Sequence, residues 1–247
     1  MSATIEYYSR RTDDMLLHNP LAISSGFSGY DDNVGSMVNR GFESTLRATA
    51  VKRENFVWNA NLMLSLNRNK VVALTSSQNT INYGNMVIEV GKPIYTFYMP
   101  KSAGVSPATG KQLYYAHYRY AIDKSGATVT EKCDEYITDN VSLAALSKYY
   151  YGSRQALFSG SIGSDFILLK GLDISFLTTF SVGGKIYDSL YGGAMNVTYA
   201  GNNWHKNVLR RWQKPGDITD VPLVEIGGNR AAVGEDLIDA SYFSIKN

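Results

Sequence analysis

The sequence has one cysteine, Cys133, among its 247 residues. A single thiol excludes an intrachain disulfide framework and any metal site built from several cysteines. The three histidines are far apart and lack the close spacing of zinc-binding motifs. We therefore expect no metal and no cofactor. We treat Cys133 as a bystander because no catalytic pattern of histidine and asparagine accompanies it.

Long apolar runs are also missing. No stretch approaches the roughly 18 consecutive apolar residues that would indicate a transmembrane helix. The first residues lack both the basic start and the apolar middle of a secretory signal peptide. Because a secreted or outer-membrane protein should carry such a signal, we expect this sequence to be a piece of a longer chain.

Charge is low as well. Asp, Glu, Lys and Arg make up 19% of the residues, below the roughly 25% that is typical of soluble proteins. The formal net charge of +2, without long basic runs, indicates no nucleic-acid partner. The 18 tyrosines, together with plentiful glycine, serine, threonine and asparagine, favour strands and hydrated loops over helices.

Alternation of apolar and polar residues is the main signal that is present. It runs through 40–51 and 55–67, which are joined by Lys52, Arg53 and Glu54. A period of two over such lengths predicts a hairpin of extended strands, each with one apolar and one polar side. These strands exceed the usual length of about 5–6 residues and reach the roughly 9–11 that a tilted strand needs to cross a bilayer.

The same alternation predicts four further strands. They cover 2–9, 155–168, 172–186 and 240–245. A tight turn at Lys170–Gly171 joins the middle two into a second long hairpin. The regions 75–153 and 188–239 are interpreted as long loops. Part of 75–153 can hold short strands or a helical turn, for which Val141–Leu146 is the candidate.

Short and long connections therefore alternate along the chain. In an up-and-down sheet this order places the short turns at one end and the long loops at the other, as in transmembrane barrels. Phe56, Trp58 and Tyr7 near strand ends suit the aromatic girdles of such barrels. We predict an all-β, antiparallel transmembrane barrel segment of about six long strands with long extracellular loops. A large soluble β-sheet protein, such as a β-sandwich, is the alternative.

Several motifs resemble one family. The stretch Asn33–Glu43 is similar to the N-x-G-x-M-x-N-x-G-x-E signature of SusC/RagA-type TonB-linked outer-membrane proteins. Other motifs match the family in order along nearly the whole chain. They are Phe56–Trp58, Asn67–Val71, Leu74, Glu89–Ile94, Gly104–Val105, Pro107–Gly110, Trp212, Pro215–Asp217 and Ala240–Asn247.

The resemblance implies part of a TonB-dependent receptor barrel of about 22 strands from a Bacteroidetes-type outer membrane. Residues 1–247 would be a C-terminal portion of the barrel domain, without the plug domain and the last strands. Such proteins are not enzymes. They import oligosaccharides, and sometimes peptides, with energy from TonB–ExbB–ExbD, and a SusD-like lipoprotein closes over the barrel as a lid.

The implied partners are therefore this lid, TonB–ExbB–ExbD through the missing plug, outer-membrane lipid and an oligosaccharide ligand. Two alternatives stay open at this point. One is a siderophore or vitamin receptor of the same superfamily, and the other is a soluble β-sandwich carbohydrate-binding module.

Two sets of side chains are candidates for function, and none of them is catalytic. Loop aromatics can stack on sugar rings or anchor the lid partner, or else pack one loop against another. These candidates are Tyr114, Tyr115, Tyr118, Trp204 and Trp212. Polar strand positions are expected to face the lumen. These are Glu43, Arg47, Asn59 and Asn61.

Overall fold

The computed structural model describes residues 1–247 except 22, 23, 25, 28, 34, 75–78, 170, 200 and 247, and except the side chains of residues 19 and 20. The chain forms two compact units. Unit 1 comprises 1–96, 152–185 and 239–247, and unit 2 comprises 97–151 and 186–238. No helix in the described part of the chain is long and apolar enough to span a membrane.

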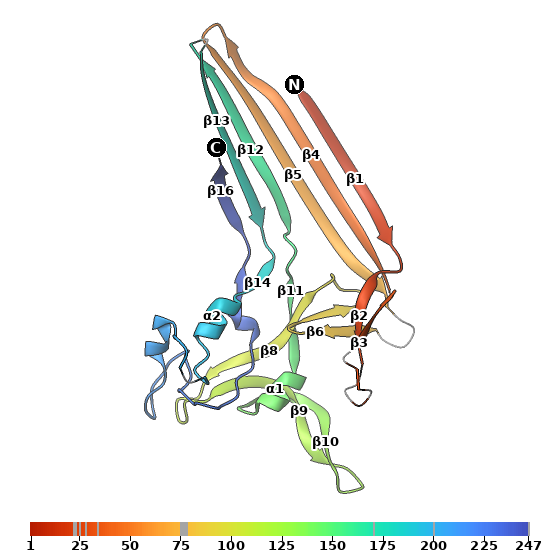
Figure 1. The fold of residues 1–247 in the computed structure, drawn as a ribbon, viewed down its shortest axis with the longest axis vertical. Coiled ribbons are helices and arrows are strands. Elements are labelled where there is room, and N and C mark those ends of the chain that lie inside the picture. Colours follow the sequence, from red (N-terminus) through yellow and green to blue (C-terminus); the bar gives the residue numbers. More distant parts are fainter. Residues whose placement is uncertain are drawn as a thin grey trace. The chain divides into compact units, whose positions relative to one another are not determined.

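A six-stranded antiparallel sheet is the main element of unit 1 (Figure 1). In spatial order its strands are β1 (Ser2–Thr12), β4 (Ser36–Arg53), β5 (Phe56–Ala73), β12 (Phe158–Leu168), β13 (Leu172–Val182) and β16 (Tyr242–Lys246). Spatial order follows chain order, so the sheet is an up-and-down meander. This arrangement confirms the predicted all-β antiparallel fold. Five of the six strands are long, with 11 or 18 residues, whereas β16 has five.

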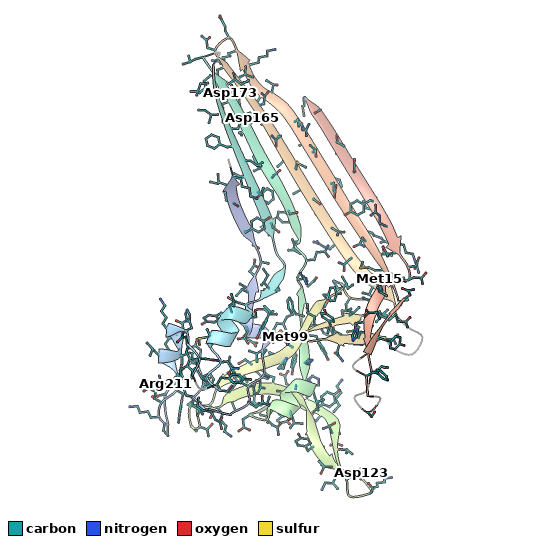
Figure 2. The ribbon with its side chains drawn as sticks, viewed as in Figure 1. Met15, Met99, Asp123, Asp165, Asp173 and Arg211 are labelled. Carbon is teal, nitrogen blue, oxygen red and sulfur yellow. The ribbon has the colours of Figure 1, made fainter. Side chains whose placement is uncertain are left out.

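The two tight turns lie at one end of this sheet, and the long connections leave from the other end (Figure 1). Figure 2 shows Asp165 and Asp173 close together at the tight-turn end. The turn between β4 and β5 consists of Glu54 and Asn55 rather than the predicted 52–54, because Lys52 and Arg53 still pair with β5. The second turn contains Gly171, whereas Lys170 lies outside the described residues.

Ladder register gives the sheet one polar and one apolar face. One row of cross-strand partners consists of Glu43, Ser65, Ser159 and Ser181. A row on the opposite face consists of Leu46, Leu62, Ile162, Thr178 and Ile245. The apolar side chains stay open to the surroundings, with exposed fractions of 47% at Ile162, 52% at Phe176 and 69% at Ile245. The described part of the chain therefore leaves this face uncovered.

Aromatic rings gather on the apolar face near the tight turns. Trp58 stacks on Phe166 with ring centroids 5.9 Å apart and an interplanar angle of 14°. Phe166 also meets Phe56 at 6.2 Å and Phe176 at 6.3 Å. Such cross-strand aromatic contacts stabilise neighbouring strands beyond the area that they bury.

Tyr7 lies at the other side of the apolar band, in a cross-strand row with Phe42 and Leu66. Trp58 and Leu66 are eight residues apart on β5, which corresponds to about 27 Å of strand. This length is close to the roughly 25 Å apolar band of outer-membrane barrels.

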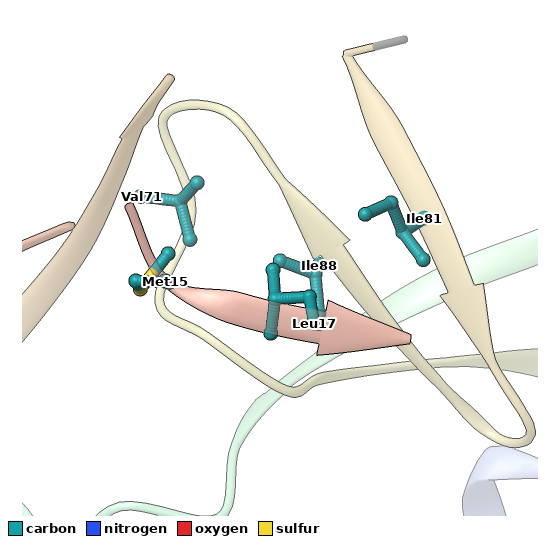
Figure 3. Close-up of a cluster of buried hydrophobic side chains, with 5 residues drawn as sticks. All are labelled: Met15, Leu17, Val71, Ile81 and Ile88. Atoms are coloured by element: carbon teal, nitrogen blue, oxygen red, sulfur yellow. The ribbon is translucent and has the colours of Figure 1, made fainter. Parts of the chain in front are cut away.

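A small core lies at the long-connection end of unit 1 (Figure 3). It joins the end of β5 to β2 (Leu16–Pro20), β6 (Thr80–Tyr83) and β7 (Met86–Glu89), and β2 pairs with β3 (Gly29–Asn33). Its buried side chains are Met15, Leu17, Val71, Ile81 and Ile88. The Asn69 side-chain oxygen accepts a 2.8 Å hydrogen bond from the Ile94 backbone N–H, which ties the following loop to β5.

Unit 2 contains strands and short helices. They are β8 (Thr96–Val105), β9 (Gln112–Ile122), β10 (Thr128–Thr138), α1 (Val141–Leu146), β11 (Lys148–Ser153), β14 (Lys185–Tyr187), α2 (Ser189–Ala194), and 3-10 helices η2 (Lys206–Arg210) and η3 (Gly234–Asp236), followed by β15 (Leu237–Asp239). The helix α1 has the predicted bounds, and the Asn140 side chain caps it by accepting from the Leu143 N–H at 3.1 Å.

The interpretation of 75–153 as a long loop with room for short strands underestimates its regular structure, because six strands, β6 to β11, lie within it. Three of them, β8, β9 and β10, have 10 or 11 residues. Its many tyrosines mark strand β9 and its neighbours rather than a loop. Tyrosine fits both a half-buried pleated surface and a loop, so its abundance alone does not separate the two.

Gly41 of β4 is a position where the sheet requires a small residue. Tyr8 of β1 is its cross-strand partner, and the Tyr8 ring lies over the glycine. A Cβ atom at position 41 would overlap that ring.

We expect Gly41→Ala to destabilise the protein by about 1–2 kcal/mol, because the Tyr8 ring must move aside. In a Tyr8→Ala background the same substitution should cost far less. Thermal unfolding of the four purified proteins of this double-mutant cycle measures both effects. An equal loss of stability from Gly41→Ala in both backgrounds would contradict the contact between the Tyr8 ring and Gly41.

Candidate functional site

The four predicted lumen positions lie together on the polar face of the six-stranded sheet. Arg47, Asn59 and Asn61 line one depression together with Asp165. Glu43 lines a second depression farther along the same face. Their shared face follows from the ladder register, while their role toward a lumen stays a prediction.

Hydrogen bonds between neighbouring strands hold several side chains of this face. The Thr49 hydroxyl donates to the Asn59 side-chain oxygen at 2.8 Å, and the Ser175 hydroxyl donates to Asp165 at 2.8 Å. These pairs give the polar face an ordered set of donors and acceptors.

Tyr114 of β9 is buried, with an exposed fraction of 1%. It packs in a core with Ala144 of α1 and Val233, and its hydroxyl oxygen accepts from the Ala231 N–H at 3.1 Å. Burial raises the pKa of the Tyr114 hydroxyl, so this group stays neutral. For Tyr114 the structure favours packing between loops over direct contact with a large ligand.

Tyr115, Tyr118 and Trp204 are more accessible. The Lys101 ammonium lies 4.3 Å from the Tyr115 ring centroid, in a cation–π contact. The Tyr118 carbonyl accepts from the Tyr136 hydroxyl at 2.9 Å. Trp204 has an exposed fraction of 37%. Contact of these three residues with a ligand or partner stays a prediction.

Trp212 fastens two loops of unit 2 together. Its indole N–H donates to the Pro107 carbonyl at 2.9 Å, and its ring covers Gly110. The Leu223 N–H donates to the Gly110 carbonyl at 2.9 Å, and the Gly216 N–H donates to Pro107 at the same distance. We call this set of contacts the Trp212 latch. It gives Trp212 a positioning role that the sequence motifs alone did not reveal.

A cavity of about 220 Å³ lies within unit 2, beside the Trp212 latch. Its buried floor consists of Gly110, Tyr114, Val197 and Pro222. Its exposed rim consists of Lys111, Asp139, Glu225 and Asn229. Four separate chain segments supply this lining, so no local spacing in the sequence could have indicated it.

Comparison with known proteins then identifies the relatives. The chain is 26% identical, over its whole length, to TonB-dependent receptor P39 of Formosa agariphila, of which it covers 27%. It is 23% identical to TonB-dependent receptor SusC of Bacteroides thetaiotaomicron, with 82% of this chain and 20% of that receptor aligned. The solved RagAB peptide transporter superposes on 98% of this chain and 26% of that one, with a TM-score of 0.75 and 25% identity.

The chain is a homologue of the TonB-dependent receptors of the SusC and RagA type. It spans about a quarter of the length of the first curated relatives it matches. No protein-family model matches it. These relatives are receptors and transporters rather than enzymes, and the resemblance drawn from the Asn33–Glu43 motif is confirmed.

We expect Gly110→Ala to destabilise unit 2, since a Cβ would overlap the Trp212 ring and the backbone φ of +72° strains a non-glycine residue. Gly126→Ala is the matched control, because Gly126 has a φ of +84° and open space around it. Limited proteolysis within 104–112 and 212–223 measures the opening of the latch. Gly110→Ala should accelerate cleavage there, whereas similar cleavage in both variants would show that backbone strain alone matters.

Proposed function

We propose that this chain is part of an outer-membrane, TonB-dependent importer of oligosaccharides, with peptides as the second candidate cargo. The six-stranded meander carries this proposal, because it is polar on one face and apolar and exposed on the other. A soluble protein covers an apolar surface of this extent. In a barrel, lipid contacts that face and water contacts the opposite one.

Backbone pairing supports the barrel. In the described part of the chain, β1 and β16 are the two edges of the sheet. Unpaired strand edges are not tolerated in hydrocarbon, so these edges require further strands of a closed barrel. We propose that residues 1–247 form a C-terminal portion of a barrel domain of about 22 strands, with the plug and the last strands elsewhere in the receptor.

The polar face then borders the lumen, where Glu43, Arg47, Asn59 and Asn61 contact water, cargo or the plug. Through the plug, TonB–ExbB–ExbD supplies energy. The long connections leave the sheet at the end opposite the tight turns, which is the extracellular end in such barrels. Within unit 2, Tyr115, Tyr118 and Trp204 are candidates for contact with cargo or with a SusD-like lipoprotein lid.

The proposal of peptides as the second candidate cargo is based on one comparison. The solved relative is named a peptide transporter, and its sequence identity to this chain is 25%, similar to that of the curated receptors. Peptide import is therefore the alternative that the uptake experiment below must separate from oligosaccharide import.

Leu62 and Met63 are adjacent on β5 and face opposite sides of the sheet, which provides a matched test of lipid contact. We expect Leu62→Arg to lower the amount of folded receptor in the outer membrane, because a cation at mid-bilayer costs about 2–4 kcal/mol on the lipid side of a barrel. Met63→Arg should be tolerated. Membrane fractionation and detergent-based folding assays measure the amount of folded receptor for each variant. Equal amounts for the two variants would contradict the assigned faces.

Uptake by whole cells tests import itself. Cells that express the full-length receptor with its lid should accumulate fluorescent oligosaccharides, and loss of TonB should abolish accumulation. Accumulation of labelled peptides instead would assign the second cargo. A full-length receptor that fractionates away from the outer membrane, or uptake that persists without TonB, would overturn the proposal.

A further inference from the structure

We infer that the cavity of unit 2 is a binding subsite for one neutral pyranose ring of the cargo. The inference rests on the proposed function, because it takes the cargo to be an oligosaccharide. It adds a defined site, whose lining apart from Gly110 and Tyr114 consists of residues that neither the sequence motifs nor the comparisons assign.

The walls of the cavity offer a small apolar contact to the C–H side of a sugar ring. Tyr114 and Val197, each 1% exposed, close the cavity, and the partly buried Val141 and Leu223 supply apolar surface beside them. Polar groups make up the larger part of the accessible lining, which suits a ligand that carries many hydroxyl groups. The volume of about 220 Å³ is the space of one small unit rather than of a chain.

The rim suits hydroxyl groups. Asp139 and Glu225 carry carboxylates that accept hydrogen bonds, the Lys111 ammonium donates them, and the Asn229 amide does both. A sugar hydroxyl also donates and accepts, so adjacent hydroxyls of one ring can satisfy this mixture.

Charge favours a neutral ligand over a charged one. The Lys111 ammonium lies 3.5 Å from Asp139, and the Arg230 guanidinium lies 3.8 Å from Asp236. Both cations of the lining thus have an acidic neighbour. A carboxylate ligand would meet Asp139 and Glu225 at the rim, and an ammonium ligand would meet Arg230 in the wall.

The Trp212 latch holds the cavity in shape. The hydrogen bond from the Leu223 N–H to the Gly110 carbonyl joins a wall residue to a floor residue. Trp212 covers Gly110 on the other side. Trp212 is therefore a positioning residue for this subsite.

Protection of an engineered thiol tests occupancy directly in the full-length receptor in detergent. The background replaces every cysteine of the full-length receptor by serine, including the partly exposed Cys133. Asn229→Cys places a thiol at the rim, and Ile218→Cys places one at a highly exposed control position of unit 2 outside the cavity. The probes are methyl glucoside, methyl galactoside and methyl mannoside, compared with methyl glucuronide and alanylalanine.

We expect at least one neutral methyl pyranoside to slow labelling of Asn229→Cys by about threefold at about twice its Kd, without slowing Ile218→Cys. Adding Glu225→Gln should weaken this protection, whereas Asp220→Asn, an exposed carboxylate outside the cavity, should leave it unchanged.

Protection only by the glucuronide would overturn the neutral ligand, and protection only by alanylalanine would overturn the sugar. No protection by any probe, or equal protection at both thiols, would overturn the subsite. The uptake experiment separates failure of the subsite from failure of the proposed function. Import that persists when labelling shows no protection would refute the subsite alone. A receptor that imports neither cargo would refute the proposed function, whatever the labelling shows.

Discussion

Strand register in the six-stranded sheet is the constraint on which the rest of unit 1 depends. Side chains alternate between the two sides, so a slip of one residue would exchange the faces. Leu62 would then occupy the polar side and Asn61 the apolar side. Close contacts across the sheet favour one register. The Tyr8 ring lies over Gly41, and the Asn61 side chain lies over Gly163. A Cβ atom at either glycine would overlap the side chain above it, so a slip that placed a larger residue there would be disfavoured.

Unit 2 depends on contacts of a different kind. Its cavity is formed by loops that the Trp212 latch, the buried Tyr114 and the capped helix α1 bring together. These contacts are specific hydrogen bonds and ring packing rather than a repeated ladder. The chain therefore combines a regular sheet, whose faces separate lipid from water in our proposal, with an irregular unit that offers a shaped polar site.

The sequence predicted the regular part well, for a physical reason. Pairing within the hairpins β4–β5 and β12–β13 is local, whereas β5 meets β12 only after a long connection. The period of two in these four strands is a property of each strand alone. The turn at Glu54 and Asn55 differed from the predicted position by a short shift, since charged residues such as Lys52 can extend a ladder. The strands within 75–153 were not located one by one, because a tyrosine-rich strand such as β9 is partly buried on both sides and shows no clear alternation.

By itself, the sequence determined the all-β class, the two-faced sheet, the sorting of short and long connections, and the relationship to SusC and RagA. Only the tertiary structure decided that Tyr114 is buried, that Trp212 covers Gly110, and that Lys111 and Arg230 line one cavity. These contacts join residues separated by up to about 120 positions, and loops carry no period from which such contacts follow. Alternation is encoded residue by residue, whereas a site built from several loops exists only when the chain has folded.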